Sequence, residues 1–206
     1  MTYYADLTPY AYGDADTDTL HYDWGYVRYH PEYERRNVGW LSAEHPFERG
    51  PVPDWFAGAL LDVIGNPSVN RYRGLHTCEF CPPGEGRAIL DPRPREGFIV
   101  INGVEEPLGP EYLAYHEIRV PAGPGVMFAA PALVWHYVAA HEYRPPVEFV
   151  EAVRRYDADW ATQPGSWIPA NAERLVYGGP RPTWPPQSRT SRPGSYQRSQ
   201  RPLRHM

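Results

Sequence analysis

Two cysteines and two histidines carry the clearest chemical pattern in this sequence. Cys78 and Cys81 are separated by two residues, a spacing that lets both sulfurs reach one metal ion. His136 and His141 are separated by four residues, within the histidine spacing of zinc fingers. A mixture of thiolate and imidazole ligands suits zinc better than hard cations. The sequence therefore predicts one tetrahedral zinc site with these four residues as metal ligands.

The length of chain between the two ligand pairs excludes a small zinc finger. Cys81 and His136 are 55 positions apart, whereas a finger has about a dozen residues between its pairs. The two histidines, five positions apart, lie about 140° apart around an ideal helix, so both rings can reach one ion only near a helix end. Closing so long a loop restrains the unfolded chain, and we expect the metal to contribute directly to folding stability.

The same residues allow other interpretations. The two cysteines can be buried free thiols or a redox pair, although Pro82 and Pro83 follow them and no thioredoxin-like unit is visible in the sequence. His76 can be a ligand in place of one of the other histidines, a hydrogen-bond partner of a ligand, or a packed ring. We expect the supporting role for His76.

Two carboxylates stand where a catalytic zinc site would use a base. Glu79 lies inside the cysteine loop and can either activate a zinc-bound water or be a solvated loop charge. Glu117 and Arg119 point to the same face of a predicted strand, where they are expected to pair. The sequence contains no further nucleophile motif and no phosphate-binding glycine loop.

These residues support three functions of different classes. The first is a zinc-stabilised interaction or regulatory protein, because four protein ligands leave no position for a reacting water. The second is a zinc hydrolase that keeps an open position, with three ligands drawn from His76, Cys78, Cys81, His136 and His141. The third is nucleic-acid binding through the C-terminal tail, with the folded part as its carrier.

The distribution of charge motivates the third hypothesis. The chain has 206 residues and a net charge of −5, and all 20 of its basic residues are arginines. Residues 1–180 contain 14 arginines against 25 acidic residues, a net charge of −11, whereas residues 181–206 contain six arginines and no acidic residue. An acidic body argues against a broad surface for duplex DNA, since phosphate contacts need clustered cations. The tail alone is suited to nucleic acid or to an acidic partner.

The cell compartment follows from what the sequence lacks. Its N-terminus shows no cationic start followed by an apolar segment, so we expect no signal peptide. No apolar run approaches the ~20 residues that span a bilayer, so we expect no membrane contact. Two cysteines do not make a secreted disulfide framework. A cytoplasmic protein is therefore expected, with its protein partner left open.

The elements expected around the site define an α+β fold. Helices are predicted at residues 54–64, 131–141 and 147–160, and short strands at 98–101, 117–120 and 126–129, the last two paired. Residues 14–34 look irregular and loop-rich, with room for about one short strand. We expect a loop-rich, zinc-stapled domain over residues 1–178, with a small antiparallel sheet and about three helices. Residues 179–206, rich in Arg, Pro and Ser, are expected to form a disordered tail.

Several of these motifs together resemble an uncharacterised bacterial family of small proteins, known as a domain of unknown function. The most specific pieces are residues 73–83 (RGLHTCEFCPP) and 136–146 (HYVAAHEYRPP), and others are residues 4–10, 37–41, 45–53 and 117–120. The resemblance spans about residues 3–153 and excludes the tail. It implies a single domain and no particular activity. The chain departs from the family in a longer insert at residues 11–36 and in His116.

Overall fold

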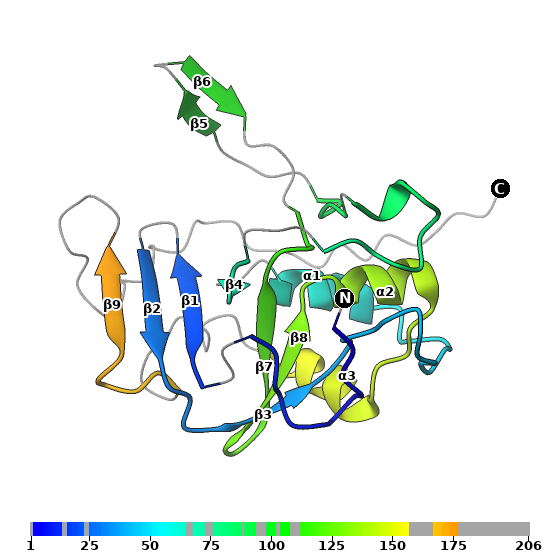
Figure 1. Cartoon of the computed structure of the whole chain (residues 1–206), viewed down its shortest axis with the longest axis horizontal. Helices are drawn as coiled ribbons and strands as arrows, with labels where there is room; N and C mark the ends of the chain where they lie inside the picture. Colours follow the sequence, from blue (N-terminus) through cyan, green and yellow to red (C-terminus); the bar gives the residue numbers. More distant parts are fainter. Residues whose placement is uncertain are drawn as a thin grey trace.

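The computed structural model of the chain confirms the α+β class, with a mixed seven-stranded sheet and three α-helices (Figure 1). It describes residues 2–13, 16–22, 25–64, 68–72, 76–87, 89–93, 98–101, 104–107, 112–156 and 167–176. The predicted tail at 179–206 lies outside these residues. Within them, no helix combines the length and the apolar character needed to cross a bilayer.

The main sheet is larger than expected. Its strands are, in spatial order, β3 (Glu34–Asn37), β8 (Val126–Pro131), β7 (Glu117–Gly123), β4 (Ser68–Val69), β1 (Asp18–Tyr22), β2 (Gly25–Tyr29) and β9 (Glu173–Val176). β7 and β8 form the predicted antiparallel pair, whereas β3 pairs with β8 in parallel, so the sheet is mixed rather than purely antiparallel. A parallel neighbour needs a long connection, and residues 38–125 provide it here.

Residues 14–34 contain two strands of this sheet, β1 and β2, instead of about one, and β3 begins at their end. β1 and β2 pair in antiparallel register, with Leu20 opposite Val27 and both side chains fully buried. Tyrosine, histidine and arginine occupy many of the neighbouring positions, and their mixed character hid the alternation that marks a strand. A separate hairpin, β5 (Phe98–Ile101) with β6 (Val104–Pro107), contains the strand predicted at 98–101.

Each helix is shorter than predicted. The first two begin later than predicted, and the third ends earlier. α1 spans Phe56–Ile64, because residues 54 and 55 form a turn. α2 spans Val134–His141, because Pro131 is the last residue of β8 and pairs with Glu117. α3 spans Val147–Arg154, and part of the region predicted to extend it, residues 157–160, lies outside the described residues.

The helices cover one half of the sheet. α1 and α3 contact β7, and Phe149 of α3 packs edge-on against Phe56 of α1 and Phe128 of β8, with ring centroids 6.3 and 5.6 Å apart. Figure 1 shows all three helices gathered beside β7 and β8, with β1, β2 and β9 extending beyond them. A second core lies on β1 and β2, where Leu20, Val27 and Tyr29 pack with Trp167 and Ile168. The sheet therefore positions α2 at one side, and no helix among the described residues covers β1 and β2.

Candidate metal centre

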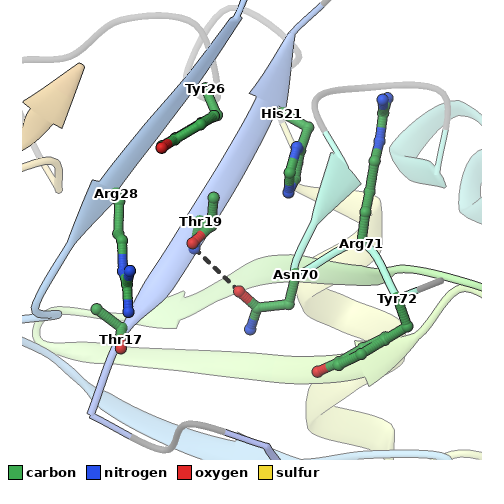
Figure 2. Close-up of a pocket in the computed structure, with 8 residues that line it drawn as sticks. All are labelled: Thr17, Thr19, His21, Tyr26, Arg28, Asn70, Arg71 and Tyr72. Atoms are coloured by element: carbon green, nitrogen blue, oxygen red, sulfur yellow. Dashed lines mark hydrogen bonds between the residues drawn. The ribbon is translucent and has the colours of Figure 1, made fainter. Parts of the chain in front are cut away.

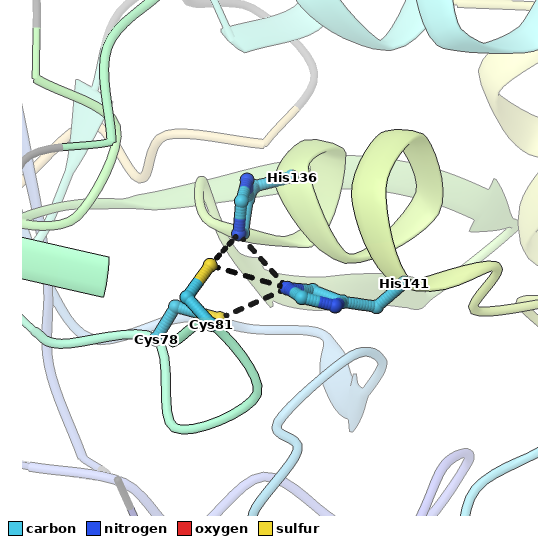
Figure 3. Close-up of side chains that lie close together, drawn as sticks. All are labelled: Cys78, Cys81, His136 and His141. Carbon is cyan, nitrogen blue, oxygen red and sulfur yellow. Dashed lines mark hydrogen bonds between the residues drawn. The ribbon is translucent and has the colours of Figure 1, made fainter. Parts of the chain in front are cut away.

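The structure brings the four predicted metal ligands together. Cys78 and Cys81 come from the loop after β4, and His136 and His141 come from α2, with both rings directed at the sulfurs (Figure 3). Their ligand atoms all lie within 4.8 Å of one another. The Nε2 atom of His136 lies 3.2 Å from the sulfur of Cys81, and the Nε2 atom of His141 lies 3.3 Å from the sulfur of Cys78.

These distances match the edges of a small coordination tetrahedron. With Zn–S near 2.3 Å and Zn–N near 2.05 Å, an ideal tetrahedron has S···N edges of about 3.6 Å and an N···N edge of about 3.4 Å. The Nε2 atoms of His136 and His141 are 3.1 Å apart, and the sulfur of Cys81 lies 3.5 Å from the Nε2 atom of His141. An ordinary hydrogen bond aims one donor at one acceptor, whereas here four donor atoms for a metal converge on a common centre.

A tight backbone turn positions the cysteine pair. The amide of Cys78 donates to the carbonyl of Gly86 over 2.8 Å, and the amide of Glu85 donates to the carbonyl of Pro82 over 3.0 Å. A Cβ atom on Gly86 would lie 2.3 Å from the carbonyl oxygen of Cys78, so only glycine fits this close approach. The sequence interpretation did not include Gly86; the Gly-Glu-Gly run just after the two prolines was the signal for it.

The end of α2 explains how two histidines five positions apart reach one point. His141 is the last helical residue, and Glu142 follows in the left-handed conformation with φ of 57°. The amides of Glu142 and Tyr143 both donate to the carbonyl of Tyr137, that of Tyr143 over 3.0 Å, so the helix ends in a wider turn than the α-helical one. Arg49 donates to the carbonyl of His141 over 2.8 Å and holds this end of the helix.

An aromatic contact fastens the cysteine loop to α2 independently of any metal. Phe80, between the two cysteines, packs edge-on against Tyr137 with ring centroids 5.5 Å apart and lies 5.6 Å from the ring of His141. On its other side Phe80 meets Phe47 at 5.1 Å. The loop and the helix are thus preorganised by apolar packing, which places the ligands before a metal binds.

Burial favours the neutral imidazoles of His136 and His141 and the protonated thiol of Cys81 in the metal-free protein. Burial, with His141 nearby, lowers the pKa of His136 to about 4, so the ring is in the neutral form that ligates metals. Burial, reinforced by Cys78, raises the pKa of the Cys81 thiol. A metal that binds here must therefore displace the proton of Cys81.

The other sequence candidates lie outside the four-residue cluster. The Nε2 atom of His76 lies 3.3 Å from the hydroxyl of Tyr12. The carboxylate of Glu79 accepts a hydrogen bond from the amide of Ala43 over 2.9 Å. The predicted pair of Glu117 and Arg119 is confirmed, with a separation of 2.7 Å and both side chains 1% exposed.

Arg119 belongs to a buried ionic network that the sequence did not reveal. Its guanidinium also bonds to Asp18 of β1 over 2.6 Å, and Asp18 is fully buried. Glu117 accepts hydrogen bonds from Tyr10 over 2.9 Å and from Tyr72. The network joins β1, β7 and the N-terminal segment, and every charge in it has an opposite partner, as buried charges require.

Comparison with known proteins gives one match. The family model of DUF7919, a domain of unknown function, matches residues 2–154. No curated protein and no solved structure matches the chain. The matched region includes all four residues of the cluster and ends at the last residue of α3.

Proposed function

The chain belongs to the DUF7919 family, and we propose that it binds one zinc ion at a closed structural site and serves as an interaction or regulatory module in the cytoplasm. The convergence of Cys78, Cys81, His136 and His141 on one point is the observation that carries this proposal. Both cysteines are free thiols, the form that persists in a reducing compartment.

The choice of zinc follows from the donor atoms. Two sulfurs and two imidazole nitrogens are the ligand set of tetrahedral zinc, whereas magnesium and calcium prefer oxygen ligands. Four of the separations between the ligand atoms, from 3.1 to 3.5 Å, are also close to the edges of a tetrahedron of that size. Copper(II) and nickel(II) favour square-planar sets of nitrogen and oxygen ligands, whereas two thiolates with two imidazoles are a ligand set of structural zinc sites.

The structural role is favoured over hydrolysis. Four protein ligands complete a tetrahedral sphere, and a catalytic zinc needs an open position for water. A hydrolase also needs a base near the metal, and the two carboxylates considered for that role have other partners. Glu79 accepts from the amide of Ala43, and Glu117 is held by Arg119 inside the buried network.

A structural zinc would tie together segments that are distant in sequence. The cysteine loop follows β4, whereas α2 follows β8, so the metal would close the long loop that contains the β5–β6 hairpin and β7. Because the unfolded chain lacks this site, zinc binding adds to the free energy of unfolding. The folded unit is proposed to extend to residue 178, and the basic segment at 179–206 is proposed as an appended tail whose contact with nucleic acid would depend on salt.

Thermal unfolding with and without zinc tests this proposal. We expect a strong chelator to lower the melting temperature by about 10 °C or more, and zinc but not magnesium to restore it. Cys81→Ser should show the low melting temperature even with zinc present. His45→Ala is the matched control, because His45 is exposed and stacks on Tyr3 outside the cluster, at a ring distance of 3.8 Å. A melting temperature that does not respond to chelator would contradict the structural role.

Zinc-loaded protein also separates the module from the hydrolase. A closed site should bind no added azide and should hydrolyse neither ester nor amide substrates. Hydrolysis that is lost with zinc and restored with it would replace the proposed module by the enzyme.

A further inference from the structure

A groove lies beside the N-terminal segment, where two cavities adjoin. One cavity, of about 250 Å³, is lined by Tyr3 and Phe47 among other residues. The other, of about 460 Å³, lies against Val147 at the start of α3. Asp6 and Glu48 line both cavities, so the two form one groove, which we call the N-terminal groove.

The N-terminal groove combines apolar walls with acidic side chains. Val147 is 68% exposed, although valine is usually buried. Glu48 forms an ion pair of 3.0 Å with Arg144, and both side chains are more than half exposed. An exposed pair of this kind contributes little to stability, so a guanidinium group from another segment can take the place of Arg144.

Asp6 is the second acidic residue of the groove, and it forms no salt bridge with an arginine in the part of the chain that the structure describes. Its carboxylate accepts hydrogen bonds from the amide of Gly39 over 2.9 Å and from the hydroxyl of Tyr143 over 2.8 Å. Burial raises the pKa of this carboxyl, because the charged form is poorly hydrated there. A guanidinium group in the groove would offset this cost and favour the charged form.

Hydrogen bonds of the backbone fix the walls of the groove. The amide of Tyr4 donates to the carbonyl of Trp40 over 3.1 Å, and the amide of Arg144 donates to the carbonyl of Glu48 over 2.9 Å. A groove fixed in this way loses little conformational entropy when a ligand binds.

The tail at residues 179–206 has the chemistry that suits this groove. Residues 181–206 contain six arginines and no acidic residue, whereas residues 1–180 carry a net charge of −11. Leu203 is the only leucine, isoleucine or valine after Val176, and it lies in the run Arg-Pro-Leu-Arg at residues 201–204. This run offers one apolar side chain between two guanidinium groups, which matches a groove with apolar walls and two carboxylates. The proline restricts the backbone to extended conformations, so docking costs less entropy.

The tail is also long enough to bring this run to the groove. β9, the last strand before the tail, and β3 are the two edge strands of the main sheet, which places them about 29 Å apart at about 4.8 Å per strand. The N-terminal segment lies along β3, where the amide of Leu7 donates to the carbonyl of Asn37 over 2.7 Å. A flexible linker with the length of residues 177–200 has a root-mean-square end-to-end distance of about 27 Å. A linker that matches the span in this way gives the highest effective concentration.

The polar pocket along β1 and β2 is less suited to the same run. Arg28 and Arg71 are among the residues that line it (Figure 2), and their charge has the same sign as that of the tail, which disfavours close approach. An arginine-rich segment is therefore expected in the N-terminal groove rather than in this pocket.

We propose that residues 201–204 dock in the N-terminal groove of the same chain. The two arginines pair with Asp6 and Glu48, and Leu203 packs against Val147. At an effective concentration of about 1 mM, a dissociation constant of about 0.1 mM keeps the run docked in about nine of ten molecules, so weak contacts are sufficient. The inference goes beyond the proposed function, because it requires neither zinc nor nucleic acid.

Photo-crosslinking from the tail of the full chain tests the proposal. His205→p-benzoylphenylalanine places a photoreactive group beside the docking run and leaves residues 201–204 unchanged. After irradiation and digestion, mass spectrometry should find crosslinks to peptides that contain residues 3–6, 41–48 or 144–147. In an equal mixture of unlabelled and 15N-labelled chains, we expect both halves of each crosslink to carry the same label. Crosslinks of mixed label would assign the groove to the tail of a second copy and contradict the proposal.

Substitutions in the groove have matched controls elsewhere on the surface. Val147→Arg should reduce the crosslinks to the groove about tenfold, because it brings a like charge against the tail. Val104→Arg should leave them unchanged, since Val104 is 58% exposed on β6 and does not line the groove. Glu48→Arg should act as Val147→Arg does, with Glu151→Arg on the exposed side of α3 as its control.

Competition with an added peptide measures the docking equilibrium. A fluorescein-labelled peptide of residues 197–206 is titrated into the unmodified full chain and into the full chain with Leu203→Ala and Arg204→Ala. Because the intact tail competes for the groove, the peptide should bind the double variant about tenfold more tightly. The proposal is overturned if the peptide binds neither chain, if it binds both equally, or if the crosslinks lie outside the groove or persist in Val147→Arg.

Discussion

Gly86→Ala is a perturbation of the metal site that leaves all four proposed ligands in place. The added Cβ atom would lie 2.3 Å from the carbonyl oxygen of Cys78, 3.1 Å from its carbonyl carbon and 3.2 Å from its nitrogen. Because the contacted atoms are backbone, no side-chain rotation relieves the clash. The backbone of Cys78 and Gly86 must move apart, and the 2.8 Å hydrogen bond between them must lengthen.

The size of the effect follows from the required displacement. Relieving the contact moves the Cys78 backbone by about 1 Å, whereas metal–ligand distances tolerate only about 0.2 Å of error. Overpacking of a tight site costs about 1–3 kcal/mol, and about 1.4 kcal/mol corresponds to a tenfold change in affinity. We therefore expect the zinc affinity of Gly86→Ala to fall about 10- to 100-fold.

Competition with a coloured zinc chelator measures this change. Gly58→Ala is the matched control, because a Cβ atom there meets nothing within 4 Å on the exposed side of α1. We expect its zinc affinity to be unchanged and its free energy of unfolding to rise by about 0.5–1 kcal/mol. If Gly86→Ala binds zinc as tightly as Gly58→Ala, the cysteine loop does not have the geometry described here.

Three further predictions concern the buried network, a buried histidine and the loop contact. Arg119→Leu leaves Glu117 buried without its cation and leaves Asp18 with Arg35 alone, so urea unfolding should show a loss of about 3–5 kcal/mol; a loss below about 1 kcal/mol would refute the role of the network. Burial and Arg71 lower the pKa of His116 to about 3 in the folded protein, whereas the unfolded histidine binds its proton near pH 6.5. The free energy of unfolding is therefore highest above pH 6.5 and falls as the pH is lowered towards 3. Between pH 5 and 6, His116→Leu should remove a slope of about 1.4 kcal/mol per pH unit from urea unfolding, and equal slopes would contradict this assignment. Phe80→Ala should lower the free energy of unfolding by about 2 kcal/mol and weaken zinc binding in the chelator assay, whereas unchanged affinity would show that the aromatic contact does not position the loop.

The clustering of the four candidate ligands was predictable from sequence because the two members of each pair lie within a few residues of each other. The spacing of Cys78 and Cys81, and that of His136 and His141, limits how far apart the members of each pair can lie. Joining the two pairs needed only the chemistry of the donors. The strands β7 and β8 were predictable for the same reason, since alternation and a glycine-rich turn occur within one short segment.

Features that depend on distant partners were not predictable in this way. Asp18 and Arg119 are 101 positions apart, and nothing in either neighbourhood specifies the other. The parallel pairing of β3 with β8 depends on the whole intervening chain. The need for glycine at position 86 arises only when the loop folds back onto Cys78. In each case the information lies in tertiary contact rather than in local pattern.

The same distinction explains the region from β1 to β2. His21, Tyr26 and Arg28 lie on one face of the hairpin, where they form a polar pocket instead of a solvated surface. The two faces do alternate, with polar residues on one and Leu20 and Val27 on the other. Aromatic and charged side chains nevertheless obscure the simple alternation of apolar and polar residues by which a strand is recognised. A strand whose polar face lines a pocket is for this reason difficult to recognise from its sequence.

X-ray absorption at the zinc edge, on protein reconstituted with one equivalent of zinc, tests the central claim most directly. We predict a four-coordinate spectrum with two sulfurs at about 2.3 Å and two nitrogens at about 2.0–2.1 Å. Cys78→Ser should leave one sulfur or no bound zinc. A spectrum of the unmodified protein with an oxygen ligand in the fourth position would contradict the closed structural site, and protein that takes up no zinc would contradict the site altogether.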